Sequence, residues 1–165
     1  MKVTIFKNVF DKKAPHHIPL QQALIRIQNG KSSTLVSEVR NGDKTKKQEL
    51  PVVCFSGEFS SRADDALFEH SGFIILDFDH VDVDQTKRAL ATDDFIHSCW
   101  TSPSGTGVKA LVQITNPERH RDHFRALVKY FERTHGLELD ESGINESRAC
   151  FESHDPDIII KDDYK

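Results

Sequence analysis

The chain has 165 residues, of which 37% are hydrophobic and 29% charged, as is usual for a globular protein of one domain or two subdomains that share a core. No run approaches the roughly 20 apolar residues that a membrane-spanning helix needs, and the first residues lack the apolar core of a signal peptide. Three widely spaced cysteines without a CxxC pair argue for reduced thiols rather than a disulfide framework or a zinc site. We therefore expect a cytoplasmic protein with no membrane partner.

The net charge of −4 is distributed unevenly along the chain. Residues 1–50 contain ten lysine and arginine residues against four acidic ones, and the remainder contains twelve against twenty-two. A basic front can contact phosphates, and an acidic remainder can hold cations. Charge asymmetry alone favours the plainer interpretation, in which both regions are solvated surface.

The predicted elements follow one another from residue 3 onward. The first seventy residues predict a strand over residues 3–9, a helix over 20–30 and a strand over 51–59. The later residues predict a strand over 72–79, a helix over 83–94, a strand over 95–102, a turn over 102–107, a strand over 108–114, a helix over 116–136 and a strand over 148–153. The long helix is the clearest, since Asn116 caps it, Pro117 opens it and Gly136 closes it.

The second half of the chain thus reads strand, helix, strand, strand, helix, strand, which is the ferredoxin-like βαββαβ plan. We predict an α+β fold, with an N-terminal α/β subdomain over residues 1–70 and the βαββαβ unit over residues 71–165. In this plan the first strand lies in the middle of the antiparallel sheet, between the third and the fourth. Five charged residues would then meet at one end of the sheet: Asp77, Asp79, Lys109, Asp140 and Arg148.

Alternation along the strand adds a second expectation. Side chains two residues apart share a face, so Phe73 and Ile75 lie on the same face as Asp77 and Asp79. The intervening apolar residues face the other way, toward the predicted helices. Because the aspartate face is itself apolar at its start, we expect residues 1–70 to cover it. The charged residues would then lie in the cleft between the two units.

The candidate metal site starts from Asp77 and Asp79, whose carboxylates follow a buried strand. A divalent cation offsets the repulsion between such carboxylates, and Mg²⁺ or Mn²⁺ suits oxygen ligands. An aspartate after a strand also commonly begins a turn, so the pair alone is ambiguous. Asp140 strengthens the metal hypothesis, because three clustered carboxylates are hard to tolerate without a metal or several cations.

The segment SPSGTGVK supports a neighbouring phosphate site. Its small residues Ser104, Gly105 and Gly107 can curl the backbone so that N–H groups point at a phosphate, and Lys109 adds positive charge. The alternative is an ordinary hairpin turn. Arg148 can bind two phosphate oxygens at once, or can form a salt bridge to one of the aspartates.

Carboxylates that hold a metal, beside cations that hold phosphates, form the apparatus of metal-assisted phosphoryl transfer. The order hhhDhD, then SGxGhK, then hD before a strand resembles the catalytic core of the archaeo-eukaryotic primase superfamily, the primase–polymerases. The segments LPVVCFSGEFSSR, HSGFIILDFDH, SPSGTGVKALVQI and SRACFESHDPDI are similar to the small bacterial primase-like family once labelled the VirE amino-terminal domain. The resemblance implies a primase-like core, in which an RRM-like βαββαβ half and an N-terminal α/β half enclose the site.

The resemblance also implies roles for individual residues. The residues that match metal ligands, which are also the implied catalytic residues, are Asp77, Asp79 and Asp140. The residues that match nucleotide-binding positions are Ser104, Gly105, Gly107, Lys109 and Arg148, with Arg62 in a further matching segment near the cleft. The superfamily usually has a histidine where this chain has Lys109, and a lysine can contact a phosphate but cannot act as a neutral acceptor.

Two main hypotheses follow. The first is a primase or primase–polymerase module, a nucleotidyltransferase that uses Mg²⁺ or Mn²⁺ to join nucleoside triphosphates on single-stranded DNA within a replication or mobile-element protein, with a helicase domain or protein as a possible partner. The second is a catalytically inactive relative that binds nucleotide or nucleic acid, favoured by Lys109 and by the absence of a helicase region from the chain. A metal-dependent nuclease is a weaker third hypothesis.

Other polar residues carry less information. His120 and His123 share a helix face but no HExxH motif, so we expect an exposed, solvated pair. The segment RNGDKTKK, residues 40–47, either contacts the backbone of a template or is a flexible basic loop, with the second interpretation slightly favoured. Trp100 is expected in the core.

Overall fold

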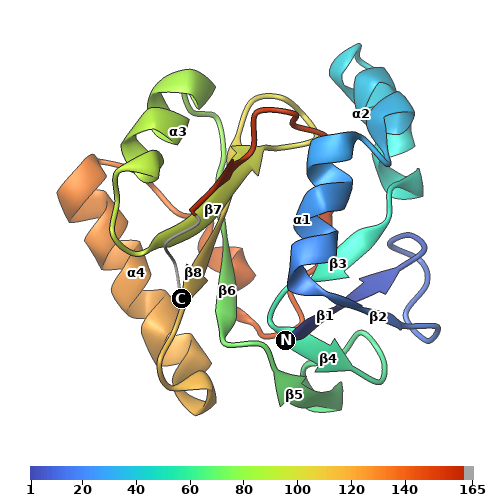
Figure 1. Cartoon of the computed structure of the whole chain (residues 1–165), viewed down its shortest axis with the longest axis horizontal. Helices are drawn as coiled ribbons and strands as arrows, with labels where there is room; N and C mark the ends of the chain where they lie inside the picture. The colour runs from blue at the N-terminus through green and yellow to red at the C-terminus, as the bar shows by residue number, and fades with distance from the viewer. Residues whose placement is uncertain (162–165) are drawn as a thin grey trace.

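The computed structural model of the chain describes residues 1–161. Within them, helices and strands form a mixed α/β structure with three antiparallel sheets (Figure 1). The helices are α1 Leu20–Asn29, α2 Ser33–Arg40, α3 Val83–Ala91 and α4 His120–His135. The strands are β1 Lys2–Phe6, β2 His16–Pro19, β3 Val52–Cys54, β4 Gly57–Phe59, β5 Leu67–His70, β6 Phe73–Phe78, β7 Ile96–Thr101, β8 Val108–Gln113, β9 Cys150–Phe151 and β10 Ile159–Ile160. No helix among these described residues is long and apolar enough to cross a membrane.

The expected α+β fold is confirmed, and the second half of the chain has its elements in the predicted order: β6, α3, β7, β8, α4 and β9. The sheet that contains β6 has the order β10-β7-β8-β6, so the pairing of the first, third and second predicted strands is as the ferredoxin-like plan requires. The register of β6 with β8 sets Asp77 directly opposite Lys109. This pairing alone brings an acidic and a basic residue, 32 positions apart in the sequence, to the same end of the sheet.

The predicted place of the fourth strand is wrong. β9 does not pair with β6 but with β3, in the separate sheet β2-β1-β3-β9, where Cys150 lies opposite Val53. β6 is therefore an edge strand of its sheet, and the far edge beside β7 is taken by β10. The chain reaches the other sheet because the segment before β9 crosses the end of β6, where the backbone N–H of Asp140 donates to the carbonyl of Asp77 at 2.9 Å.

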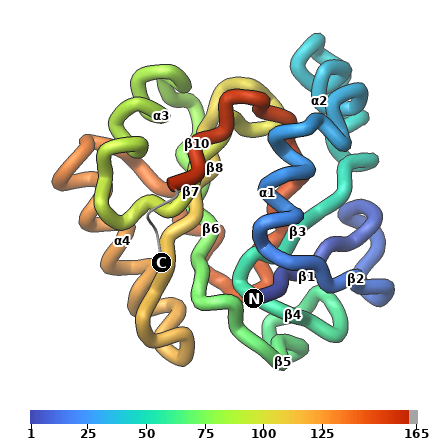
Figure 2. Tube along the Cα trace, in the orientation of Figure 1, coloured from blue at the N-terminus to red at the C-terminus, as the bar shows by residue number. Residues whose placement is uncertain are grey.

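Alternation along β6 sorts its side chains between two hydrophobic cores, as expected. Ile74, Leu76 and Phe78 pack with residues of α3 and α4 on one face of the sheet. Phe73 and Ile75 pack on the other face, against α1 and the N-terminal sheet. In Figure 2, α1, α2 and the strands β1–β3 lie on one side of the molecule, and α3, α4 and the strands β6–β8 lie on the other.

A third, smaller core lies between the N-terminal sheet and the β4–β5 hairpin. It contains the side chains Phe6, Val52, Cys54 and Phe59. The predicted strand over residues 51–59 is thus two strands in different sheets, with a turn at residues 55–56. The N-terminal sheet also receives β9 from beyond residue 70, so strands from both sides of that position contribute to it.

The ends of the long helix only partly follow the sequence signals. Gly136 ends α4 in the left-handed conformation, at φ 64, as a C-terminal glycine is expected to do. At the other end, residues 117–119 form a short 3₁₀ turn before α4 starts, and the Asn116 side chain makes no capping hydrogen bond. The helix is one turn shorter than the pattern predicted.

Candidate functional site

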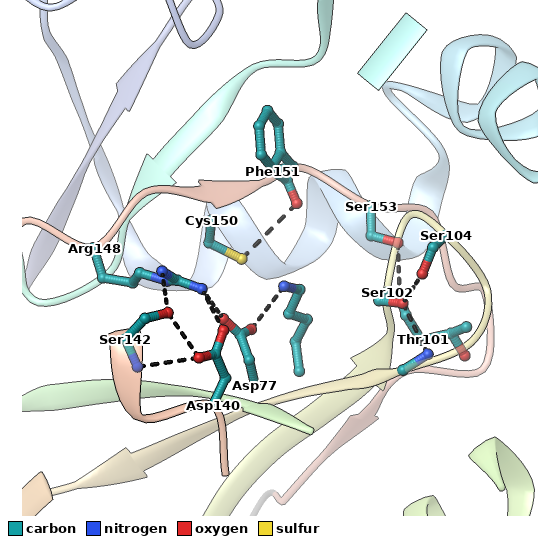
Figure 3. Close-up of polar contacts among 12 residues, drawn as sticks. Asp77, Thr101, Ser102, Ser104, Asp140, Ser142, Arg148, Cys150, Phe151 and Ser153 are labelled. Carbon is teal, nitrogen blue, oxygen red and sulfur yellow. Dashed lines mark hydrogen bonds and ion pairs between the residues drawn. The ribbon is translucent and has the colours of Figure 1, made fainter. Parts of the chain in front are cut away.

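The candidate site lies at the end of β6, on the face of the strand that is turned toward the N-terminal sheet. Lys109 Nζ, from β8, is 2.7 Å from Asp77 Oδ1, and Arg148 Nη2 is 2.9 Å from Asp77 Oδ2. The same Arg148 nitrogen is 3.2 Å from Asp140 Oδ2. Figure 3 shows the two aspartates converging on this guanidinium, which extends from the segment just before β9. Four of the five predicted residues are therefore brought together by direct contacts.

The Asp77 carboxylate is held in its ionised form. Its side chain is 6% exposed, against 14% for Lys109 and 27% for Arg148. Burial by itself raises the pKa of Asp77, but the adjacent Lys109 ammonium and Arg148 guanidinium outweigh burial, so the pKa lies below its ordinary value. Burial likewise acts to lower the pKa of Lys109, yet neighbouring negative charge, with Asp77 among its sources, raises it overall. The pair is charged on both sides.

Asp140 is fixed by a local turn. Its Oδ1 accepts hydrogen bonds from the backbone N–H of Ser142 at 3.0 Å and from the Ser142 hydroxyl at 2.7 Å. These bonds, with a smaller contribution from Arg148, hold the pKa of Asp140 below its ordinary value. The Asp140 carboxylate therefore caps the short 3₁₀ helix Glu141–Ile144 while its other oxygen contacts the guanidinium.

Asp79 lies apart from this contact network. Its residue is exposed, one position beyond the end of β6, and it lines a pocket of about 260 Å³ together with His80, Glu138, Leu139 and Asp140. Among residues 1–161, no three histidine, cysteine or acidic side chains are grouped closely enough to hold a metal ion as they stand. The expected convergence of three carboxylates on one point is therefore not found among the described residues: Asp77 and Asp140 share the Arg148 guanidinium, whereas Asp79 only lines the same pocket as Asp140.

The residue types that line this pocket are those that bind a hard divalent cation, although their side chains are not grouped around one point as they stand. Asp79, Asp140 and Glu138 are among its lining residues, and carboxylate oxygens are the ligands that Mg²⁺ and Mn²⁺ prefer. Both oxygens of the Asp77 carboxylate are already in contact with cations, Oδ1 with Lys109 and Oδ2 with Arg148. Asp77 can join a metal only if it gives up a cation.

The turn between β7 and β8 has its polar groups bonded within itself. Ser102 N–H donates to the Gly107 carbonyl, and the N–H groups of Gly105 and Gly107 donate to the carbonyl and hydroxyl of Ser102. The Ser104 hydroxyl bonds to those of Ser102 and Thr106. In Figure 3, Ser102 and Ser104 form a group with Thr101 and Ser153, apart from Asp77 and Asp140. The hairpin-turn interpretation accounts for these contacts.

Gly107 has a definite structural reason to be glycine. A Cβ atom at this position would lie 2.8 Å from the carbonyl oxygen of Phe78 and 3.3 Å from the Ser102 hydroxyl. The turn therefore presses against the end of β6, next to Asp79. This close approach joins the turn to the aspartate strand and places Lys109, two residues later, opposite Asp77.

Arg40 is a residue of this region that the sequence did not single out. It ends α2, and its Nη2 donates to the carbonyls of Ser102 at 2.9 Å and of His154 at 3.0 Å. Burial lowers the pKa of Arg40. Its place in the basic segment 40–47 suggested a solvent-facing loop, yet Arg40 instead connects α2 to the turn. The sequence gives little indication of this contact, because a single arginine at the end of a helix is common.

Asp64 positions the segment that carries Arg148. Its Oδ1 accepts from the backbone N–H and the hydroxyl of Ser147, at 3.1 and 2.6 Å, and from Asn145 Nδ2 at 3.2 Å. Its Oδ2 lies 3.3 Å from Arg121 Nη2 of α4. Arg62, close by in sequence, donates to the carbonyl of Val9 at 2.7 Å and makes no ion pair with the Asp77 cluster within the described residues.

His120 differs from its expectation, because it is buried rather than exposed. Its Nδ1 lies 3.0 Å from Nε2 of His70, whose own Nδ1 accepts from the backbone N–H of Gly72. Accepting at Nδ1 makes Nε2 of neutral His70 the donor to His120. Burial lowers the pKa of His120 to about 4, so the pair stays neutral at neutral pH. The contact thus connects the end of β5, just before β6, to the start of α4.

Cys150 lies near the charged cluster of Asp77, Lys109 and Arg148. It is buried, and its side chain belongs to the core between the two sheets, which Phe73 and Ile75 of β6 enter from the other side. Burial raises the pKa of the Cys150 thiol to about 12, so the thiol is neutral. The three cysteines are free, as expected from their spacing.

A second pocket lies at the opposite end of the same core. Its volume is about 720 Å³, and it is lined by apolar residues of α1 and by the start of β6 and the end of β8, at Phe73 and Gln113. It contains no carboxylate. Its polar lining residues include His97 and Lys161, so it does not share the acidic character of the Asp77 end.

Comparison with known proteins gives one match. Residues 45–159 match the family described as BT4734-like, N-terminal domain, a range that includes Asp77, Lys109, Asp140 and Arg148. Neither the curated proteins nor the solved structures include a match to the chain. Since the matched range covers well over half of the 165 residues, the chain belongs to the BT4734-like, N-terminal domain family.

Proposed function

We propose that the chain is a metal-dependent nucleotidyltransferase module of the primase–polymerase type, which joins nucleotides on a single-stranded DNA template. The observation that carries the proposal is the convergence of Asp77, Lys109, Asp140 and Arg148 from four separate segments. Carboxylates beside cations, next to a pocket that Asp79 and Asp140 line, are suited to hold a metal-bound triphosphate. The motif resemblance supplies the reaction class.

Each residue has a role in this proposal. Asp79 and Asp140, with Asp77 after it releases a cation, hold Mg²⁺ or Mn²⁺, which when bound supplies charge neutralisation for the triphosphate. Lys109 and Arg148 contact the phosphate oxygens, and Arg148 is suited to bind two at once. The rim of the turn at Ser104 and Gly105 borders the triphosphate. In the cell, the expected setting is a cytoplasmic replication or mobile-element protein with a helicase partner.

A second candidate, a catalytically inactive module that binds nucleotide or nucleic acid, is favoured by a different observation. The Asp77 carboxylate already contacts two cations, which is the arrangement of a structural ion-pair cluster. Lys109, where the resembling enzymes usually have a histidine, supplies one of them. A metal-dependent nuclease is the third candidate, since it needs similar carboxylates but less machinery for a triphosphate.

One assay separates the three candidates. The protein is incubated with Mn²⁺ or Mg²⁺, labelled nucleoside triphosphates and single-stranded DNA, beside an Asp77→Ala/Asp79→Ala variant. The matched control is Asp122→Ala, which removes an exposed carboxylate of α4 whose ion-pair partners within residues 1–161 are the neighbouring Arg119 and Arg125. Products that lengthen, and that need the two aspartates but not Asp122, support the transferase.

The other outcomes point elsewhere. Products that shorten with the same dependence support the nuclease and reject nucleotide transfer. DNA or nucleotide binding without any metal-dependent product supports the inactive module. The double variant is also compared with the wild type by circular dichroism, because loss of activity counts only when the fold is retained.

A further inference from the structure

Two cations already occupy the only buried carboxylate of the candidate site within the described residues. Lys109 lies 2.7 Å from one oxygen of Asp77, and Arg148 lies 2.9 Å from the other. A metal ion that approached Asp77 in this arrangement would meet both positive charges at short range. Metal binding at Asp77 therefore requires that at least one of them leave.

The cations are not fully secured by other bonds. Arg148 Nε is buried without a hydrogen-bond partner among residues 1–161, and Asp77 is the one acidic partner that the Lys109 ammonium has within them. A purely structural buried pair gains stability by satisfying such atoms, because an unsatisfied buried polar atom is destabilising. The guanidinium also contacts Asp140 and, at 3.3 Å, the Ser142 hydroxyl, both of which are more accessible than Asp77. Arg148 thus has partners on the side of the pocket.

We infer that Lys109 and Arg148 are exchangeable counter-ions of Asp77, which a polyphosphate draws away so that the carboxylate becomes free to bind a divalent cation. The inference rests on the proposed function, since it takes the triphosphate and the metal as ligands of this site. Each ligand then raises the affinity for the other, because linkage between two binding events is reciprocal. Without a polyphosphate, the two cations keep a metal ion from Asp77, and a bound polyphosphate makes the Asp77 carboxylate available to it.

The first arm of the test measures metal binding without any phosphate. Mn²⁺ is titrated into the wild type and into Lys109→Met, and free Mn²⁺ is followed by electron paramagnetic resonance. Lys109→Met keeps the aliphatic chain but removes the charge, so Mn²⁺ binds about tenfold more tightly than to the wild type. Lys87→Met is the matched control, because Lys87 pairs with Asp155 at 2.6 Å and is similarly buried, at 11% exposure. This variant leaves the Mn²⁺ affinity unchanged.

The second arm measures phosphate binding without any metal. Inorganic tripolyphosphate is titrated calorimetrically, in chelator-treated buffer, into the wild type and into Asp77→Asn. Removing the carboxylate frees Lys109 and Arg148, so tripolyphosphate binds about tenfold more tightly to the variant. The matched control is Glu152→Gln, a buried carboxylate whose charged partner is Arg26 rather than either of these cations. Thermal unfolding verifies that each variant is folded at the temperature of the titration.

Equal Mn²⁺ affinity in the wild type and Lys109→Met overturns the inference, as does unchanged or weaker tripolyphosphate binding by Asp77→Asn. These failures are distinct from failure of the proposed function. Template-directed synthesis by a protein that shows neither shift refutes the counter-ion exchange and keeps the transferase. Both shifts without any synthesis support the exchange and favour the inactive binding module.

Discussion

The stability of the protein should depend strongly on Asp77, even though Asp77 is the central carboxylate of a candidate metal site. Replacing it by asparagine leaves Lys109, which is 14% exposed, without its ion-pair partner. Removing one partner of a buried ion pair costs about 3–5 kcal/mol. Arg148 keeps its contact with Asp140 and is more exposed, so we expect the lower end, about 3 kcal/mol. For a chain of this size that loss lowers Tm by about 6–12 °C.

The assay is guanidinium unfolding followed by the fluorescence of Trp100, the single tryptophan, which is fully buried. Asp79→Asn is the control, because that residue is exposed and its replacement should change the free energy of unfolding by less than about 0.5 kcal/mol. Since the folded-state pKa of Asp77 lies below its ordinary value of 3.8, its contribution is complete well above pH 4. It is lost as the pH falls through the folded-state pKa.

A loss below about 1 kcal/mol for Asp77→Asn at neutral pH would refute the reasoning, because it would mean that Lys109 finds water or another partner at no cost. A stabilising effect would be still more informative. It would mean that the carboxylates repel one another in solution, as in an open metal site, and that the two cations do not neutralise Asp77.

Three further predictions concern other parts of the molecule. Folding lowers the pKa of His120 from 6.5 to about 4, so the burial of neutral His120 leaves the free energy of unfolding unchanged above pH 6.5 and lowers it by up to about 3 kcal/mol as the pH falls toward 4. Urea unfolding at several pH values should show this loss in the wild type and a smaller loss in His120→Gln. Gly107→Ala should destabilise by about 1–3 kcal/mol in thermal unfolding, since its Cβ would lie 2.8 Å from the Phe78 carbonyl; an unchanged Tm would contradict this close approach. Arg26→Met should cost about 3 kcal/mol by stranding the buried Glu152 carboxylate, and the double variant with Glu152→Met should recover much of it; a double variant less stable than Arg26→Met would argue against a desolvation penalty.

Local patterns predicted much of the second half of the chain. The alternation of side chains along β6 correctly separated Ile74 from Phe73, one facing the helices and the other facing the N-terminal unit. It also put Asp77 on the inner face. These predictions hold because the two-residue period of a strand is a property of the backbone, independent of which strand lies next to it.

Strand partners were less predictable. β9 consists of Cys150 and Phe151, and each of them is accommodated in an apolar core, so nothing in their character specifies one sheet over the other. The partner was decided by the path of the chain before it, which crosses the end of β6 at Asp140. The buried His70–His120 contact was missed for a similar reason, because the two residues come from separate elements that only packing brings together.

The sequence by itself determined that acidic and basic residues would gather at the end of one strand, because strand periodicity and antiparallel pairing fix which positions share a face and which lie opposite. Only the tertiary structure decided how their charges are arranged: Lys109 and Arg148 neutralise Asp77, while Asp79 turns to solvent beside the pocket. The physical reason is that the partner of a side chain depends on which segments of the chain pack next to it, here β6, β8 and the segment before β9. A buried carboxylate needs a positive partner, and the packing of these segments decides which cations lie within about 3 Å of it.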